Sequence, residues 1–277
     1  MDISIIIVSW NCRGKLKENL ENLFQSKGDF DMEVFVVDNN SQDGTVEMVN
    51  KKFEQVKVIA NSENLGFAKA NNQAIRKASG RYTLLLNPDM RVYPDTLKNM
   101  LEWMDTRPET GVSGCHLVNE KGDTVSHVRR FPRLGDQLAI VLKIPHFFPK
   151  VLNKYLQKNF DYNKEAEVDS IRGSFFMIRK EALAEIGELD ERFFIWFEEV
   201  DYCQRAWRAG WKVMYTSAAQ CLDYVGQSFA LVKKGTTQRY FRDSMLKYFR
   251  KWKPSWQYWV LRVAWAPVIV AVKFTKK

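Results

Sequence analysis

Cysteine and histidine are scarce in this chain, and the few that occur do not cluster. The 277 residues include four cysteines and three histidines. No two cysteines form a CxxC pair, and His116, His127 and His146 fit no metal-ligand or catalytic-triad pattern. Neither a zinc site nor a disulfide framework is therefore expected. The sequence instead predicts reduced thiols in a cytosolic compartment, with histidines that are structural or exposed.

Glycine-rich phosphate loops and long apolar runs are also missing. Neither G-x-G-x-x-G nor G-x-x-x-x-G-K occurs at a strand–helix junction, which excludes a dinucleotide fingerprint and a P-loop. The apolar run that begins at Ile3 is too short for a signal peptide and is typical of a core strand. Residues 255–272 are mostly apolar but contain Arg262 and Pro267, which favours an interfacial helix over one that spans a bilayer.

Strand-like and helical patterns alternate through the first hundred residues. Apolar runs predict strands at 3–8, 33–38, 57–60 and 82–86, and apolar residues at helical spacing predict helices between them. Such alternation predicts an α/β fold with a mainly parallel sheet. Shorter strand-like pieces follow at 112–118 and 123–130. After an irregular or helical insertion at 134–160, the pattern resumes near residue 174 and includes a last strand at 212–215. We expect one large domain over residues 1–232, since this length provides ample core.

The net charge of +9 is concentrated in a C-terminal tail, residues 233–277. This tail holds 12 Lys or Arg and one acid, so it carries +11 and leaves residues 1–232 at about −2. Basic and aromatic residues together suit an anionic membrane surface, at about 1 kcal/mol per basic residue. They also suit a nucleic-acid backbone, but the acidic body offers no broad basic face, so no nucleic-acid partner is expected. A tail packed on its own domain or in a homodimer stays open.

Asp38 ends an apolar strand, EVFVVD, and is followed by the turn-forming run NNSQDGT. In open α/β sheets, small molecules bind beyond the carboxyl ends of the strands. A carboxylate there can accept hydrogen bonds from a ribose hydroxyl or a base N–H. Taken alone, the segment is more typical of a strand followed by an Asx turn.

Three other polar segments stand at strand ends or helix starts: VSWN (8–11), NLGFAKANN (64–72) and LLLNPD (84–89). Together with the Asp38 loop, in this order and spacing, they resemble the bacterial family two glycosyltransferases of GT-A type fold over about residues 3–230. Within that family the chain looks most similar to rhamnosyltransferases that build surface polysaccharides. The resemblance implies a nucleotide-binding half over residues 1–100 and an acceptor half over residues 101–232. It also implies a nucleotide-sugar site that contains Ser9, Asn11, Asp38, Asn40, Gly66, Asn72, Asn87, Asp89 and Gly173.

The family has a metal motif, two acids separated by one residue, where this chain has Asn87-Pro88-Asp89. A divalent cation, Mg²⁺ or Mn²⁺, would there stabilise the departing nucleoside diphosphate. Because the first acid is replaced by Asn87, we expect the metal to arrive with the sugar nucleotide, whose phosphate oxygens supply further ligands. Asp223 stands where relatives often have a His that touches the metal or the diphosphate. Asp89 and Asp223 are therefore the predicted metal ligands.

The segment 187–205 is similar to the family's acceptor-side motif: aromatic residues, two adjacent acids, then an acid and an Arg on the following helix. Sugar transfer requires a general base that takes the proton of the attacking hydroxyl. The resemblance assigns this role to Glu199, where the usual residue is Asp. Asp201 is the second catalytic candidate, placed to orient Arg205 or to cap the helix. One placed base, with no second carboxylate to form a covalent intermediate, predicts inversion at the sugar.

These observations predict an inverting, metal-dependent hexosyltransferase of cell-envelope polysaccharide synthesis. It would move a sugar such as rhamnose from a dTDP- or UDP-linked donor to a lipid-linked or polysaccharide acceptor. It would lie in the cytoplasm at the inner face of the membrane, with homo-oligomers left open. A sugar nucleotidyltransferase is the alternative enzyme, but residues 8–16 hold only one Gly with Arg13 and Lys15, not a glycine-rich basic loop. A nucleic-acid-binding module acting through the tail is the alternative of another class.

Overall fold

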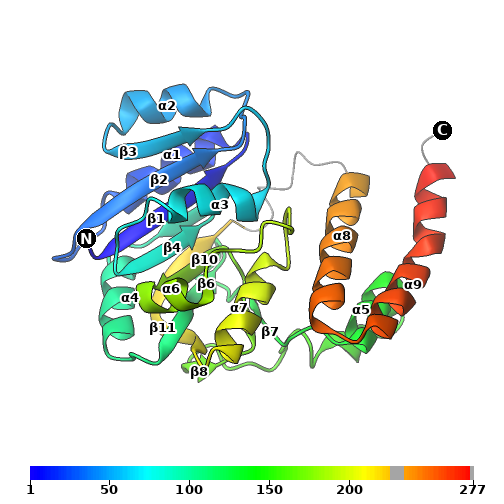
Figure 1. Cartoon of the computed structure of the whole chain (residues 1–277). Helices are drawn as coiled ribbons and strands as arrows, with labels where there is room; N and C mark the ends of the chain where they lie inside the picture. The colour runs from blue at the N-terminus through cyan, green and yellow to red at the C-terminus, as the bar shows by residue number, and fades with distance from the viewer. Residues whose placement is uncertain (225–233, 275–277) are drawn as a thin grey trace.

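A mixed sheet with helices on both faces forms the centre of the molecule (Figure 1). The computed structural model describes residues 1–224 and 234–274, and within them nine strands join this sheet. Its order is β3-β2-β1-β4-β10-β6-β11-β5, and β8 pairs with β11. The strands are β1 (Ile3–Ser9), β2 (Met32–Asp38), β3 (Val56–Ala60), β4 (Tyr82–Leu86), β5 (Met90–Val92), β6 (Thr110–Val118), β8 (Ala166–Glu167), β10 (Phe175–Arg179) and β11 (Lys212–Asp223).

The first four strands are parallel, as the sequence predicts, because helical crossovers connect them. Strand β10 enters antiparallel between β4 and β6, whereas β6 and β11 are parallel. A separate antiparallel pair consists of β7 (Val128–Arg129) and β9 (Ser170–Ile171). The helices of the sheet domain are α1 (Arg13–Leu23), α2 (Thr45–Lys52), α3 (Phe67–Ile75), α4 (Thr96–Asp105), α5 (Leu134–Val141), α6 (Lys180–Ile186) and α7 (Glu198–Arg208).

Both faces of the sheet are buried, and β1 shows how the sequence achieves this. Side chains of a strand alternate between faces, so Ile5 and Ile7 pack with α1, α2 and α4 while Ile6 packs with α3 and α7 on the other face. A β-strand that is apolar at nearly every position is the pattern of a strand covered by helices on both sides. The predicted α/β fold class is confirmed.

Three segments differ from their expected form. The last strand of the sheet, expected at 212–215, continues to Asp223 because residues 220–222 pair with β6. The expected strand at 123–130 shrinks to β7. The insertion at 134–160 contains α5 and two short 3-10 helices, η1 (Ile144–His146) and η2 (Pro149–Leu152). The longer final strand carries Asp223 to the same edge of the sheet as Met90.

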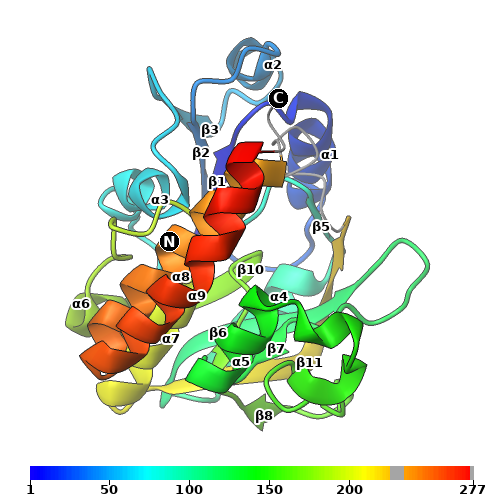
Figure 2. The same cartoon turned by 90° about the vertical axis from the view of Figure 1, so that its right-hand side faces the viewer.

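The C-terminal tail forms a hairpin of two helices beside the sheet domain (Figures 1 and 2). These are α8 (Lys234–Trp252) and α9 (Ser255–Phe274). A third apolar cluster joins α8, α9 and α5 to the start of α7 through Phe197, Tyr248, Phe249 and Leu261. No helix in the described ranges is long and apolar enough to cross a membrane. Residues 225–233 lie outside the description, as do the side chains from Pro267 onward.

Candidate active site

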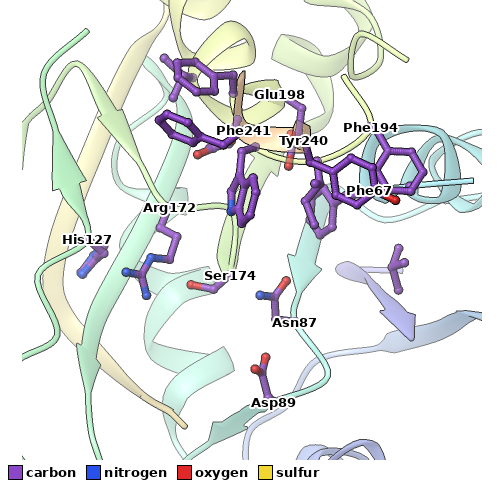
Figure 3. Close-up of a pocket in the computed structure, with 18 of the residues that line it drawn as sticks. Phe67, Asn87, Asp89, His127, Arg172, Ser174, Phe194, Glu198, Tyr240 and Phe241 are labelled. Atoms are coloured by element: carbon purple, nitrogen blue, oxygen red, sulfur yellow. The ribbon is translucent and has the colours of Figure 1, made fainter. Parts of the chain in front are cut away.

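A cavity of about 850 Å³ opens at the carboxyl ends of the first strands and is closed on one side by α8 (Figure 3). It is lined by residues from all five segments that the sequence singled out, 8–11, 33–45, 64–72, 84–89 and 187–205, and both Asp89 and Glu199 belong to its wall. Of the predicted site residues, those that line it are Gly66, Asn87, Asp89, Gly173, Glu199 and Asp223. This is the crevice in which ligands of open α/β sheets bind.

The loop after β4 holds Asn87 and Asp89 in place through backbone hydrogen bonds. The Asn87 N–H donates to the Ser174 carbonyl at 2.9 Å, and the Asn87 carbonyl accepts from the Asn19 side-chain amide at 2.9 Å. The Asp89 carbonyl accepts the Tyr224 N–H at 3.3 Å, directly after the end of β11. Asp89 and Asp223 therefore lie on neighbouring backbone segments, and they are only 5% and 4% exposed.

Asp223 forms an ion pair across the cavity. Arg172 Nη1 lies 3.0 Å from Asp223 Oδ2 and donates a hydrogen bond to it. Figure 3 shows the Arg172 side chain beside Ser174, to the left of Asn87 in this view. Its guanidinium supplies positive charge beside the Asp223 carboxylate.

The side chains at this point suit a hard divalent cation, but few of them can be metal ligands. Asp89, Asp223 and Asn87 can each bind a cation through a side-chain oxygen, the ligand atom that Mg²⁺ and Mn²⁺ prefer. No group of three or more His, Cys, Asp or Glu side chains that could hold a metal occurs in the part of the chain that is described. The residues therefore fit a cation whose coordination is completed by a phosphate ligand.

Glu198, which is buried, and Glu199, which is half-buried, start helix α7 and line the cavity as an adjacent pair. Trp196 and Phe197 precede them with φ of 63° and 68°, a left-handed conformation that costs non-glycine residues energy. This turn directs both carboxylates inward, and burial raises the pKa of each. The charge of Glu199 raises the Glu198 pKa further, whereas Arg172 works in the opposite direction on Glu199. The positive charge of Arg172 thus favours the ionised form of Glu199.

Gly66 lies at the contact between the start of α3 and the segment that precedes α7. Its φ is +81°, and a Cβ built there would lie 2.3 Å from the Phe194 carbonyl oxygen. The same carbonyl accepts the Phe67 N–H at 2.7 Å, and the Gly66 carbonyl accepts from the Asn39 side chain at 3.2 Å. Gly173 lies next to Glu199, since a Cβ on it would be 3.5 Å from the Glu199 Cβ.

Asp201 and Asn72 do not line the cavity. Asp201 is fully buried, accepts hydrogen bonds from Arg205 at 3.0 Å and Trp252 at 2.7 Å, and pairs with Lys251 at 2.6 Å. Asn72 exchanges hydrogen bonds with the Leu189 backbone at 2.9 and 3.0 Å. Both side chains join elements of the fold, so the structure places neither beside the predicted reacting groups.

The residues predicted at the ends of β1 and β2 also stand outside the cavity wall. Ser9 is buried beside Cys12, and the Asn11 N–H and side chain bond Ser41 and Gln42, so the two loops brace each other. Asn40 is exposed and bonds Gln42. Asp38 accepts the Ser41 N–H at 2.8 Å through Oδ2, while its buried Oδ1 has no hydrogen-bond partner among the residues described.

Several lining residues were not predicted from the sequence. His127, Arg129 and Tyr155 come from the segment between β6 and β8, and Tyr240 and Phe241 come from α8. Burial lowers the His127 pKa to about 4, so the ring is neutral, and its Nδ1 bonds the Val125 carbonyl at 2.8 Å. Arg129 donates to the backbone carbonyls of Val128 and Ser126. No local motif identifies these residues, because the β7–β9 pair and the tail bring them in from distant positions.

The chain is similar in sequence to known proteins. The profile described as "Glycosyl transferase family 2" matches residues 4–187. The chain is 26% identical over 210 residues to N-acetylglucosaminyl-diphospho-decaprenol L-rhamnosyltransferase of Mycobacterium tuberculosis, covering 70% of this chain and 67% of that protein. It is 25% identical over 230 residues to rhamnosyltransferase WbbL of Escherichia coli K12, covering 80% and 83%.

The fold is similar to that of solved structures. The mannosyltransferase PcManGT from Pyrobaculum calidifontis, in complex with GDP-Man and Mn²⁺, matches with a TM-score of 0.62 at 19% identity, over 97% of this chain and 75% of that one. TarS of S. aureus matches with a TM-score of 0.58 at 18% identity, over 92% and 44%.

Proposed function

The chain belongs to glycosyl transferase family 2, and we propose that it transfers a sugar from a nucleoside-diphosphate donor to a hydroxyl of a lipid-linked or polysaccharide acceptor. The observation that carries this proposal is that Asp89 and Glu199 line a single cavity. Its volume, about 850 Å³, suits a nucleotide sugar together with part of an acceptor. Asp89, the proposed acid on the donor side, and Glu199, the proposed base, can thus both act on one bound donor and acceptor.

The names of the relatives support the choice of substrates. Two of them are rhamnosyltransferases, and the mycobacterial protein is named for a diphospho-decaprenol acceptor. We therefore assign this chain to cell-surface glycan synthesis, with rhamnose as the first sugar to test. A dTDP- or UDP-linked donor and a lipid-diphosphate acceptor are the corresponding substrates.

The proposed reaction is one direct displacement with inversion. The acceptor hydroxyl loses its proton to a Glu199 carboxylate oxygen while its own oxygen forms a bond to the anomeric carbon. The bond between that carbon and the diphosphate oxygen breaks, and the nucleoside diphosphate leaves with the electron pair. Base catalysis of this kind contributes about 10²–10⁴-fold, and a pKa raised by burial suits a base that works near neutral pH.

Asp89, Asp223 and Asn87 are the proposed holders of Mg²⁺ or Mn²⁺. When bound, the cation would neutralise charge that develops on the leaving diphosphate. Arg172 contributes a fixed positive charge beside the Asp223 carboxylate. Asp38, through its unpartnered Oδ1, is the proposed acceptor for a nucleobase or ribose donor group.

The proposed domain division follows the charge and the fold. Residues 1–232 form the transferase domain, with nucleotide and acceptor halves over 1–100 and 101–232. Residues 233–277 form a basic, aromatic tail that holds the enzyme against the inner face of the membrane, where a lipid-linked acceptor lies. The net charge of +11 in this tail supports an anionic surface as its partner.

The proposal is tested by incubating the protein with dTDP-rhamnose or UDP-sugars, Mn²⁺ and a short-chain diphospholipid-linked sugar. We expect a glycosylated acceptor whose new linkage, read by NMR, has the opposite anomeric configuration to the donor. Retention would contradict the single displacement. A lack of any thermal stabilisation by nucleoside diphosphates and their sugars would contradict the whole proposal.

A further inference from the structure

The outward face of α9 carries large apolar side chains that no other part of the described chain covers. Leu261 and Trp265 are buried in the cluster with α8 and α5. The side chains of Trp256, Trp259, Val260 and Val263 are 57%, 54%, 39% and 68% exposed. Their spacing of three, four and seven residues places them on one stripe of the helix. Single exposed apolar residues are ordinary, but a continuous stripe marks an interaction surface.

A second exposed apolar group lies in the insertion after α5. We call it the 142–151 ridge: Leu142, Phe147, Phe148 and Val151, which are 56%, 79%, 68% and 44% exposed. Helix α5 packs against α9, and η1 and η2 follow α5 in contact with it. Figure 2 shows α9 and the green segment around α5 on the side of the molecule that faces the viewer. Two segments about 110 residues apart in sequence, each with exposed apolar side chains, therefore lie on one side of the molecule.

The rim of this face is basic. Residues 137–160 include Lys143, Lys150, Lys154 and Lys158, all exposed, and no acid. On α9, Arg262 is exposed and lies over the Trp259 ring at 5.0 Å from its centroid. Apolar and aromatic side chains ringed by Lys and Arg match the acyl boundary and the headgroups of an anionic leaflet. A second copy of the chain is a poorer occupant, because it would bring the same positive rim against this one.

We propose that the α9 stripe and the 142–151 ridge together form one docking surface for an anionic lipid bilayer. This inference rests on the proposed function, which places the acceptor in the membrane, and it adds a second contact that the tail alone does not supply. Helix α8 lies between this surface and the cavity: its Tyr240 and Phe241 line the cavity, while its Met245 packs in the cluster that contains Leu261 of α9. Because α9 and α8 both lie between the docked leaflet and the cavity, docking would bring the leaflet to within about two helix diameters, roughly 20 Å, of the catalytic cavity.

The test compares full-length variants by sedimentation with vesicles of phosphatidylcholine and phosphatidylglycerol. Phe147→Ser with Phe148→Ser removes the ridge, and Trp256→Ser with Trp259→Ser removes the α9 stripe. Trp207→Ser is the matched control, because Trp207 is 59% exposed but belongs to α7. Each double variant should lower the vesicle partition coefficient about tenfold or more, whereas the control should leave it unchanged. Melting temperature and nucleoside-diphosphate affinity, measured alongside, should stay at the wild-type values.

The outcomes separate the two proposals. If the tryptophan variant loses binding and the phenylalanine variant keeps it, the two-part surface is wrong while membrane association through the tail survives. If the wild-type chain ignores anionic vesicles altogether, both fail. If it instead dimerises in solution and Phe147→Ser with Phe148→Ser abolishes the dimer, a second copy is the occupant and the lipid proposal is overturned.

Discussion

Arg172 and Asp223 form an ion pair inside the cavity, with Arg172 Nη1 3.0 Å from Asp223 Oδ2. Asp223 is only 4% exposed and stands at the end of β11, next to the Asp89 loop. The positive charge that a diphosphate site requires is thus partly present in the protein itself. A cation that uses Asp223 as a ligand must compete with Arg172 for the same carboxylate.

Replacing Arg172 should therefore strengthen metal binding in the absence of nucleotide. We expect Arg172→Gln to raise the Mn²⁺ affinity of the nucleotide-free protein roughly tenfold, because Asp223 loses a competing cation. Electron paramagnetic resonance of free Mn²⁺ measures this directly. Arg129→Gln is the control, since Arg129 lines the same cavity but donates to backbone carbonyls. Equal Mn²⁺ affinity in wild type and Arg172→Gln would mean that the pair does not limit metal access.

Gly66→Ala should damage both folding and activity. The Cβ would meet the Phe194 carbonyl oxygen at 2.3 Å, so the contact between α3 and the segment before α7 must shift. Gly122→Ala is a matched control, because Gly122 has φ +83° and nothing within 4 Å of its Cβ position. The control should lose about 1 kcal/mol of unfolding free energy from backbone strain, and Gly66→Ala about 3 kcal/mol. Similar losses in urea denaturation would show that the Phe194 contact can relax without cost.

Asp201→Ala should destabilise the fold more than it alters chemistry. The Asp201 carboxylate is fully buried and holds Arg205, Lys251 and Trp252, so its removal takes a carboxylate partner from two largely buried cations and an acceptor from the Trp252 N–H. A loss of about 3–5 kcal/mol is expected, measured by denaturant unfolding. Asp243→Ala, at a partly exposed pair with Arg242, should cost less than about 1 kcal/mol. A stable Asp201→Ala protein without transferase activity would instead support a direct catalytic role.

Stability should fall with rising pH because of Glu198. Its pKa is raised in the folded protein by burial and by the charge of Glu199, so the folded state binds the proton more tightly than the unfolded state. The resulting stability is complete below the unfolded pKa of about 4.5 and is lost as pH rises through the folded pKa.

Glu198→Gln, which cannot ionise, should escape this loss. The melting temperature of Glu198→Gln minus that of the wild type should increase by a few degrees between pH 5 and pH 8. The same difference for Glu120→Gln, at an exposed position, should not change with pH. A constant difference across this range would contradict a protonated, buried Glu198.

The sequence predicts those parts of the site that follow from strand order. Asn87 and Asp89 come directly after a buried parallel strand, and carboxyl ends of such strands meet at one edge of the sheet, so their position could be predicted. The family resemblance added Glu199, which lies in the same cavity. The sequence also indicates that Asp201 turns away from Glu199, because residues two apart on a helix do not share a face, and the structure pairs Asp201 with Arg205 as expected.

Other residues reach the cavity through long-range packing, and no local sequence pattern identifies them. Arg129 and Arg172 reach the cavity because β7 pairs with β9, and Arg129 lies opposite Ser170 in that pairing. Tyr240 and Phe241 enter because α8 packs against the start of α7. The basic and aromatic composition of this tail indicates a surface role, and its inner side also forms a wall of the cavity.

The most direct test of the account is the turnover of Glu199→Gln and Glu199→Asp in the transfer assay. Glutamine preserves the shape of the side chain but cannot take a proton, so kcat should fall about 10²–10⁴-fold while the donor dissociation constant changes less than about threefold. Aspartate, which keeps the carboxylate, should restore a large part of the rate. If Glu199→Gln turns over at the wild-type rate, Glu199 is not the base and the proposed displacement is wrong.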